Sequence, residues 1–163
     1  MAETALDAQD QRHLRAAIAW AAVARARGNQ PFGAVLVAPD DRVLAEAYCD
    51  THQTGDCTGH AETNAVRAAS PQHDRAVLAT STLYSSAEPC VMCAGAIFWS
   101  GIGRVVFGID AVRLREFRGE RTEQRDAALS CRDVFAAASH PIECVGPALL
   151  AEAGASHVGF WKS

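Results

Sequence analysis

The sequence predicts an α/β domain built on a mixed β-sheet. A strand–turn–strand pattern opens the predicted sheet, and short β-branched runs then alternate with helical patterns. The length of 163 residues fits one domain with one sizeable core. Hydrophobic residues make up 49% of the chain and charged residues 21%, which is typical of soluble globular proteins. We therefore expect a single domain over residues 1–163.

The first third of the chain predicts a helix followed by a β-hairpin. Apolar residues at helical spacing indicate an amphipathic helix from Asp7 to Arg27, which Gly28 ends. Small and β-branched residues then predict a strand over Gly33–Val37. After a Pro-Asp-Asp turn, a second strand is expected over Arg42–Tyr48. The polar stretch Asp50–Thr58 is expected to be a loop.

The remaining chain predicts three more strands, each separated from the next by helical segments. Proline and glycine residues mark most of the expected boundaries. The predicted helices are Gly59–Ala69, Cys90–Ser100 with Pro89 at its first position, part of the charged stretch Asp110–Arg125, Cys131–Ala138 and a terminal helix from Pro147 onward. The predicted strands are Thr82–Ser85, Arg104–Phe107 and Ile142–Val145.

Charge and hydropathy exclude several classes of protein. The net charge is -4, and there is no basic tail, so a nucleic-acid partner is not expected. No apolar run has the length of a membrane span. The start of the chain, Met1–Gln11, is acidic and polar and does not read as a secretory signal, so a cytoplasmic location is the default expectation.

Three side chains form a candidate metal site. Cys90 and Cys93 are three residues apart at the start of a predicted helix, so both lie on one helix face. Helix N-termini favour anions and lower thiol pKa values, which suits metal-bound thiolates. With the imidazole of His60 they form a zinc ligand set whose fourth position stays open, as in catalytic zinc sites. We predict one Zn²⁺ per chain and no disulfide framework.

Glu62 is the predicted catalytic residue. It lies two residues after His60, a rotation of about 200° on a helix, and is poorly placed to bind the same ion. It is better placed to take a proton from water, whose pKa zinc lowers, and to pass it to a leaving group. Two alternatives remain. A C-x-x-C sequence also occurs as a redox pair, and His52 or Cys57 would close the zinc site as a fourth ligand.

Together the two motifs match the H-x-E…P-C-x-x-C signature of zinc deaminases. The chain resembles the cytidine deaminase-like superfamily, and within it the branch of tRNA adenosine, guanine and fungal-type cytosine deaminases. The resemblance covers about residues 10–110 and is looser from His140 onward. The stretches that carry it are Pro31–Val37, His60–Val66, Ser86–Ile97 and Gly103–Gly108.

The resemblance implies a three-layer α/β/α fold around a five-stranded mixed sheet, usually in a homodimer. It implies hydrolytic removal of an amino group, as ammonia, from a nitrogen heterocycle. The three ligands named above would bind zinc, and Glu62 would shuttle protons. Ala61 would offer its backbone to the ring edge of the substrate, and Phe32 would form part of the pocket wall.

The chain departs from this branch at two places. An Asn near the end of the second strand usually binds the base, but that position here is Cys49, followed by Asp50. A thiol is a weak hydrogen-bonding group, so base recognition must differ, or Asp50 substitutes after a one-residue shift. The stretch Ile109–Phe117 also lacks the Gly-Phe-Asp-Asp segment of guanine deaminases and is longer and more charged than in the tRNA enzymes.

The favoured function is zinc-dependent hydrolytic deamination of a nucleobase or nucleoside, a small-molecule substrate. The alternatives are adenosine-to-inosine deamination of tRNA and a non-catalytic, zinc-stabilised binding module. Trp161, with Phe160 before it, is expected either to close over the substrate ring, as terminal aromatics do in related small-base deaminases, or to pack the last helix onto the core or a dimer partner.

Overall fold

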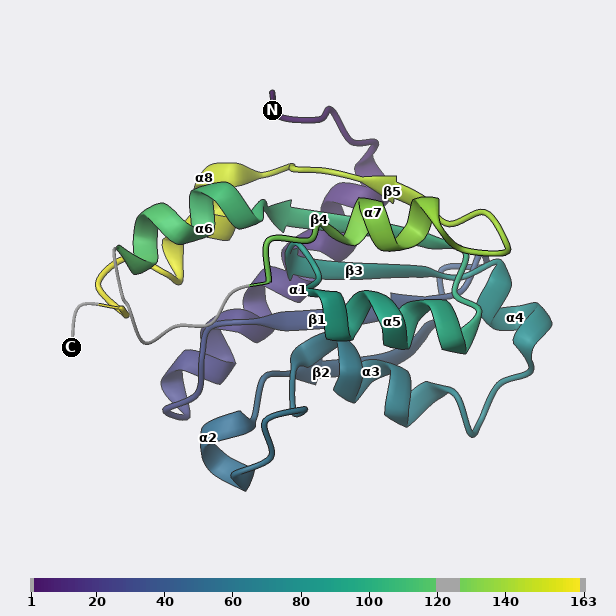
Figure 1. The fold of residues 1–163 in the computed structure, drawn as a ribbon, viewed down its shortest axis with the longest axis horizontal. Helices are drawn as coiled ribbons and strands as arrows, with labels where there is room; N and C mark the ends of the chain where they lie inside the picture. Colours follow the sequence, from purple (N-terminus) through teal and green to yellow (C-terminus); the bar gives the residue numbers. More distant parts are fainter. Residues whose placement is uncertain (1, 120–126, 162–163) are drawn as a thin grey trace.

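The computed structural model describes residues 2–119 and 127–161. Its centre is a five-stranded sheet in the order β2-β1-β3-β4-β5 (Figure 1). Strand β1 runs antiparallel to β2 and β3, whereas β3, β4 and β5 run parallel to one another, so the sheet is mixed as predicted. The strands are β1 (Gly33–Val37), β2 (Val43–Tyr48), β3 (Thr82–Ala87), β4 (Arg104–Ile109) and β5 (Glu143–Val145).

Helices cover both faces of the sheet and complete three layers, which confirms the α/β/α prediction (Figure 1). One face carries α1 (Ala8–Ala26) and α8 (Leu150–Ala155). The other face carries α3 (Ala61–Ala69), α5 (Val91–Ser100) and α7 (Cys131–Ala136). Strand β1 is buried along its whole length because its alternating side chains serve both layers. Val35 packs in the cluster with α1, and Leu36 packs in the cluster with α3 and α5.

A close approach between α1 and β1 fixes the position of the first residue of β1, near the site. A Cβ atom on Gly33 would lie 2.2 Å from the carbonyl oxygen of Ala17 and 2.5 Å from the backbone nitrogen of Ala21. The backbone N–H of Gly33 donates to Ser86 Oγ at 3.0 Å, which joins β1 to the end of β3. Glycine is therefore required here for contact between two backbones.

The structure differs from the predicted elements mainly at their ends. Strands β3 and β4 each continue two residues beyond the predicted Ser85 and Phe107. Helix α5 starts at Val91, so Pro89 precedes the N-cap and is not its first helical residue. Helix α7 ends earlier than expected, and α8 begins three residues after Pro147.

Two further helices lie outside the predicted helices, and a third lies in the stretch that was predicted to be only partly helical. Helix α2 (Thr51–Thr54) is one turn within the predicted loop, and α4 (Arg75–Ala79) precedes β3. Helix α6 (Ala111–Arg118) forms the first part of the charged stretch, and residues 120–126 of that stretch lie outside the described residues. Across the described ranges, no helix combines the length and apolar character needed to span a bilayer.

Candidate metal centre and active site

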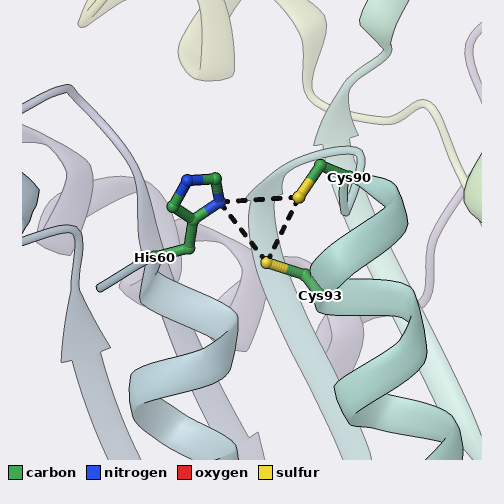
Figure 2. Close-up of side chains that lie close together, drawn as sticks. All are labelled: His60, Cys90 and Cys93. Carbon is green, nitrogen blue, oxygen red and sulfur yellow. Dashed lines mark hydrogen bonds between the residues drawn. The ribbon is translucent and has the colours of Figure 1, made fainter. Parts of the chain in front are cut away.

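The three predicted metal ligands converge at the N-terminal ends of two neighbouring helices (Figure 2). His60 is the N-cap residue of α3, and Cys90 is the N-cap residue of α5. Both have extended backbone angles, which turn the incoming chain into the helix. Cys93 lies in the first turn of α5, on the same side as Cys90. Both helix N-termini face the site, and their partial positive charge favours thiolates there.

The spacing of the ligand atoms fits a tetrahedral zinc ion. His60 Nδ1 lies 3.5 Å from each sulfur, and the two Sγ atoms are 3.6 Å apart. Zinc–sulfur bonds of about 2.3 Å and zinc–nitrogen bonds of about 2.0 Å at tetrahedral angles require about 3.5 Å between sulfur and nitrogen and about 3.8 Å between sulfurs. The donor set and its dimensions therefore fit one Zn²⁺ per chain.

The thiols of the site influence each other's ionisation. The contact with Cys93, followed by that with His60, lowers the pKa of the Cys90 thiol. The same contact between the sulfurs, together with burial, raises the pKa of Cys93. Because zinc ligates thiolates, metal binding releases thiol protons, and zinc affinity should rise with pH.

Glu62 is held beside the ligands by a buried hydrogen bond. Its side chain is 5% exposed, and its Oε1 accepts from Ser85 Oγ at 2.7 Å. Its Oε2 accepts from Cys93 Sγ at 3.4 Å, so the carboxylate adjoins the metal site without belonging to its ligand triangle. Burial, and then the neighbouring Cys90 charge, raises the pKa of Glu62. A carboxyl group that holds a proton more readily than usual suits proton transfer near neutral pH.

Neither candidate fourth ligand joins the site. His52 directs its Nδ1 to the carbonyl oxygen of Gly28, 3.1 Å away, and the thiol of Cys57 is exposed. Within residues 2–119 and 127–161, His60, Cys90 and Cys93 form the sole cluster of three or more candidate ligands. Among the described residues, the three donors therefore leave a fourth tetrahedral position open, an arrangement typical of catalytic zinc sites.

The metal site adjoins a cavity of about 430 Å³. Glu62 and Cys90 line it together with Phe32, as predicted for the pocket wall. This volume suits a small heterocycle, since ligand pockets commonly measure about 300–1,000 Å³. The cavity is also lined by residues that the sequence analysis did not predict, among them Gln30, Glu88, Leu114, Arg115 and Arg118.

Helix α6 forms a wall of the cavity, within the stretch Asp110–Ser130 that the sequence suggests as pocket-shaping, but none of its residues was predicted to line the site. Its residues Leu114, Arg115 and Arg118 line the cavity. The N-terminus of α6 is tied to the site motif because Glu88 Oε2 accepts from the backbone N–H of Ala111 at 2.9 Å. The only sequence signal was a charged stretch of helical character, which does not reveal the tertiary neighbour of that helix.

The structure places Cys49 and Asp50 outside the lining of the cavity. Cys49 is fully buried, and its Sγ lies 3.5 Å from Thr51 Oγ1. Burial raises the pKa of this thiol. Asp50 Oδ1 accepts from Asn64 Nδ2 at 2.9 Å and packs against Gly59, so this carboxylate braces the chain before α3. Their predicted contact with substrate finds no support in this geometry and stays a prediction.

The other two predicted substrate contacts also lie behind the cavity surface. Ala61 is fully buried as the first residue of α3. Trp161 is 4% exposed, and its ring lies 6.2 Å from that of Phe32, which lines the cavity. Trp161 therefore packs behind the pocket wall in this structure, which corresponds to the packing alternative. The roles predicted for its side chain and for the Ala61 backbone remain predictions.

Residues 7–109 match the model of the cytidine and deoxycytidylate deaminase zinc-binding region. The chain belongs to this family. A probable cytosine deaminase of Schizosaccharomyces pombe is 43% identical over 161 residues, which cover 99% of this chain and 98% of that protein. A tRNA-specific adenosine deaminase of Haemophilus influenzae is 41% identical over 99 residues, which cover 61% of this chain and 57% of that protein.

The fold is also that of solved deaminases. The guanine deaminase of Nitrosomonas europaea matches with a TM-score of 0.73 and 22% identity, over 96% of this chain and 86% of that one. At this identity the likeness shows the fold alone. The family match ends at residue 109, so α6, which forms a wall of the cavity, lies beyond the matched segment.

Proposed function

We propose that the protein is a zinc-dependent aminohydrolase that acts on a free nucleobase, with a cytosine-like aminopyrimidine as the favoured substrate. The observation that carries the proposal is the position of Glu62, a buried carboxylate beside an open three-ligand zinc site at the edge of a small cavity. The reaction consumes water, replaces the amino group of the ring by an oxo group and releases ammonia.

Each residue of the site has a distinct task in this reaction. A zinc ion held by His60, Cys90 and Cys93 would make a water molecule more acidic and a better nucleophile. Glu62 accepts a proton from the attacking water and delivers it to the departing amino group. Ser85 fixes the carboxylate through its hydrogen bond to Oε1, which leaves Oε2 to face the reaction centre. Phe32 offers an apolar face against which a planar ring can pack.

The preference for a free base rests on the extent of similarity and on the size of the cavity. Similarity to the probable cytosine deaminase spans essentially both chains, including α6, whereas similarity to the tRNA-specific deaminase covers a shorter part. The net charge of -4 disfavours binding to a polyanion. A gel shift with tRNA at low salt would support the alternative of tRNA deamination, and its absence would remove it.

The decisive experiment is a screen for ammonia release by the zinc-loaded protein over free bases, nucleosides, nucleotides, triazines and tRNA. Glu62→Gln is the matched variant because the amide keeps the shape and can still meet Ser85. We expect one zinc per chain in both proteins and a fall in kcat of about 10²–10⁴-fold in the variant. Turnover that survives this substitution with zinc bound would contradict the mechanism.

We further propose a cytoplasmic homodimer. The side chain of Trp99 is 76% exposed and that of Val91 is 39% exposed, and both lie on α5, an outer helix of the fold. Because tryptophan is enriched at protein–protein interfaces, the exposed Trp99 supports this proposal. Sedimentation of the wild type against Trp99→Lys tests the prediction, which expects a dimer for the former and a shift toward monomer for the latter.

A further inference from the structure

The turn Gln30–Phe32 presents two neighbouring side chains to the cavity. The backbone N–H of Phe32 donates to the carbonyl oxygen of Gln30 at 2.8 Å, which closes a three-residue turn around the buried Pro31. Both Gln30 and Phe32 line the cavity that contains Glu62. The proline ring restricts the backbone of the turn, so the Cα atoms that carry the two side chains are held in a fixed relation.

Phe32 is packed from behind and supplies the apolar face of the pocket. Its ring lies 5.3 Å from the ring of His157 and 6.2 Å from that of Trp161. A planar base stacked on such a face exposes its edge to the polar groups around it. Gln30, two residues earlier on the same turn, is half-buried at the wall of the cavity.

The carboxamide of Gln30 has no hydrogen-bond partner within the described part of the chain. It therefore offers both a donor and an acceptor to a ligand. The other polar side chains of the wall do not offer this pair. Glu88 accepts from Ser130 Oγ at 2.6 Å and from the backbone N–H of Ala111 at 2.9 Å. Arg115 and Arg118 carry guanidinium groups, which donate hydrogen bonds but never accept them.

We propose that Gln30 is the specificity-determining residue that reads the edge of the base. Its Oε1 accepts from a ring N–H, and its Nε2 donates to the adjacent carbonyl oxygen. This pair of hydrogen bonds selects aminopyrimidines with an unsubstituted N1–H next to a C2 carbonyl group, which means free cytosine rather than cytidine. A sugar at N1 removes the donor that Oε1 would accept. The inference rests on the proposed deaminase function and assigns to Gln30 the task that Cys49, sealed from the cavity, does not perform.

The test compares wild type, Gln30→Met and the control Gln72→Met on three compounds. Methionine keeps the length of the side chain without its hydrogen bonds, and Gln72 is exposed at the far end of α3. The compounds are cytosine, cytidine and 4-aminopyrimidine, which lacks both the C2 carbonyl group and the N1–H. Ammonia release gives kcat and KM, and a compound that is not hydrolysed is measured by its competitive Ki.

For Gln30→Met we expect kcat/KM for cytosine to fall about tenfold to a hundredfold, mainly through KM, because two hydrogen bonds to the substrate are lost. The values for 4-aminopyrimidine should stay within about twofold, and the control should match the wild type. Zinc content of one per chain in each protein verifies an intact site. Wild-type preference for cytosine over cytidine is a second readout that does not depend on the variant.

Unchanged kinetics of Gln30→Met on cytosine would overturn the inference, and so would an equal loss on 4-aminopyrimidine or a wild-type preference for cytidine. In each of these outcomes the wild type still releases ammonia, so the proposed aminohydrolase activity stands, and only a preference for cytidine would also change the proposed substrate from a free base to a nucleoside. Failure of the zinc-loaded wild type to deaminate any heterocycle of the wider screen would instead contradict the proposed function and the inference together.

Discussion

Replacing His157 by Phe should reduce the loss of folding stability that the protein undergoes in acid. His157 follows α8, is 1% exposed, and is surrounded by the rings of Phe32, Phe117 and Trp161 at 5.3, 6.0 and 6.0 Å. Its Nδ1 accepts from Trp161 Nε1 at 3.2 Å, and its Nε2 has no partner within the described residues. A second proton on this ring would break the bond to Trp161 and bury a charge.

Burial, followed by the charges of Arg118 and Arg25, lowers the pKa of His157 from 6.5 to about 4. The unfolded chain therefore takes up this proton first as the pH falls. Stability from the neutral ring is complete above pH 6.5 and is lost progressively between pH 6.5 and pH 4. The loss amounts to about 2 kcal/mol at pH 5 and about 3 kcal/mol at pH 4.

The assay is urea unfolding of zinc-loaded wild type and His157→Phe between pH 8 and pH 4. Phenylalanine keeps the stacked packing but does not ionise. Acid release of zinc affects both proteins equally, so the difference between their free energies of unfolding isolates His157. The variant should gain about 2 kcal/mol relative to the wild type on going from pH 8 to pH 5. His52→Phe, at an exposed position, is the control. Parallel pH profiles of wild type and His157→Phe would refute the reasoning.

Three other substitutions or treatments have defined outcomes. Gly33→Ala should destabilise the protein by about 3 kcal/mol in urea unfolding, because its Cβ would meet the α1 backbone at 2.2 Å; a loss below 1 kcal/mol would contradict this contact. Chelation of zinc should lower Tm and abolish ammonia release, both restored by added Zn²⁺; an unchanged Tm would argue against a ligated site. If the Trp161 ring supports Phe32 against the substrate, Trp161→Ala should raise KM about tenfold, and unchanged KM and kcat would contradict this role.

The metal centre was predictable because its chemistry is encoded locally. The spacing of Cys90 and Cys93 places both thiols on one turn of a helix, and the two-residue step from His60 to Glu62 separates the candidate ligand from the predicted proton carrier. Each motif contains its own helix start, so the geometry within a motif depends little on the rest of the chain. The mixed five-stranded sheet was likewise predictable, because β-branched runs and turn residues mark each strand.

The local conformation of other segments was harder to predict from the sequence. The short helices α2 and α4 have too few residues to show an apolar period, so tertiary contacts decide their form. The Pro before Cys90 indicated a helix start, but the N-cap fell on Cys90 itself. Element boundaries of this kind depend on capping contacts that a sequence pattern does not specify.

The sequence by itself indicated the candidate metal ligands, the candidate proton carrier Glu62 and the class of reaction, since residues a few positions apart on one helix turn have a nearly fixed relation. The approach of His60 to the two cysteines was decided by the packing of α3 beside α5. Only the tertiary structure decided which groups face the substrate. Cys49 was aligned with a base-binding position but is buried, whereas Gln30 and Arg118, far apart in the chain, share one cavity. The direction of a side chain at the end of a strand depends on what packs against it, and that information lies in distant residues.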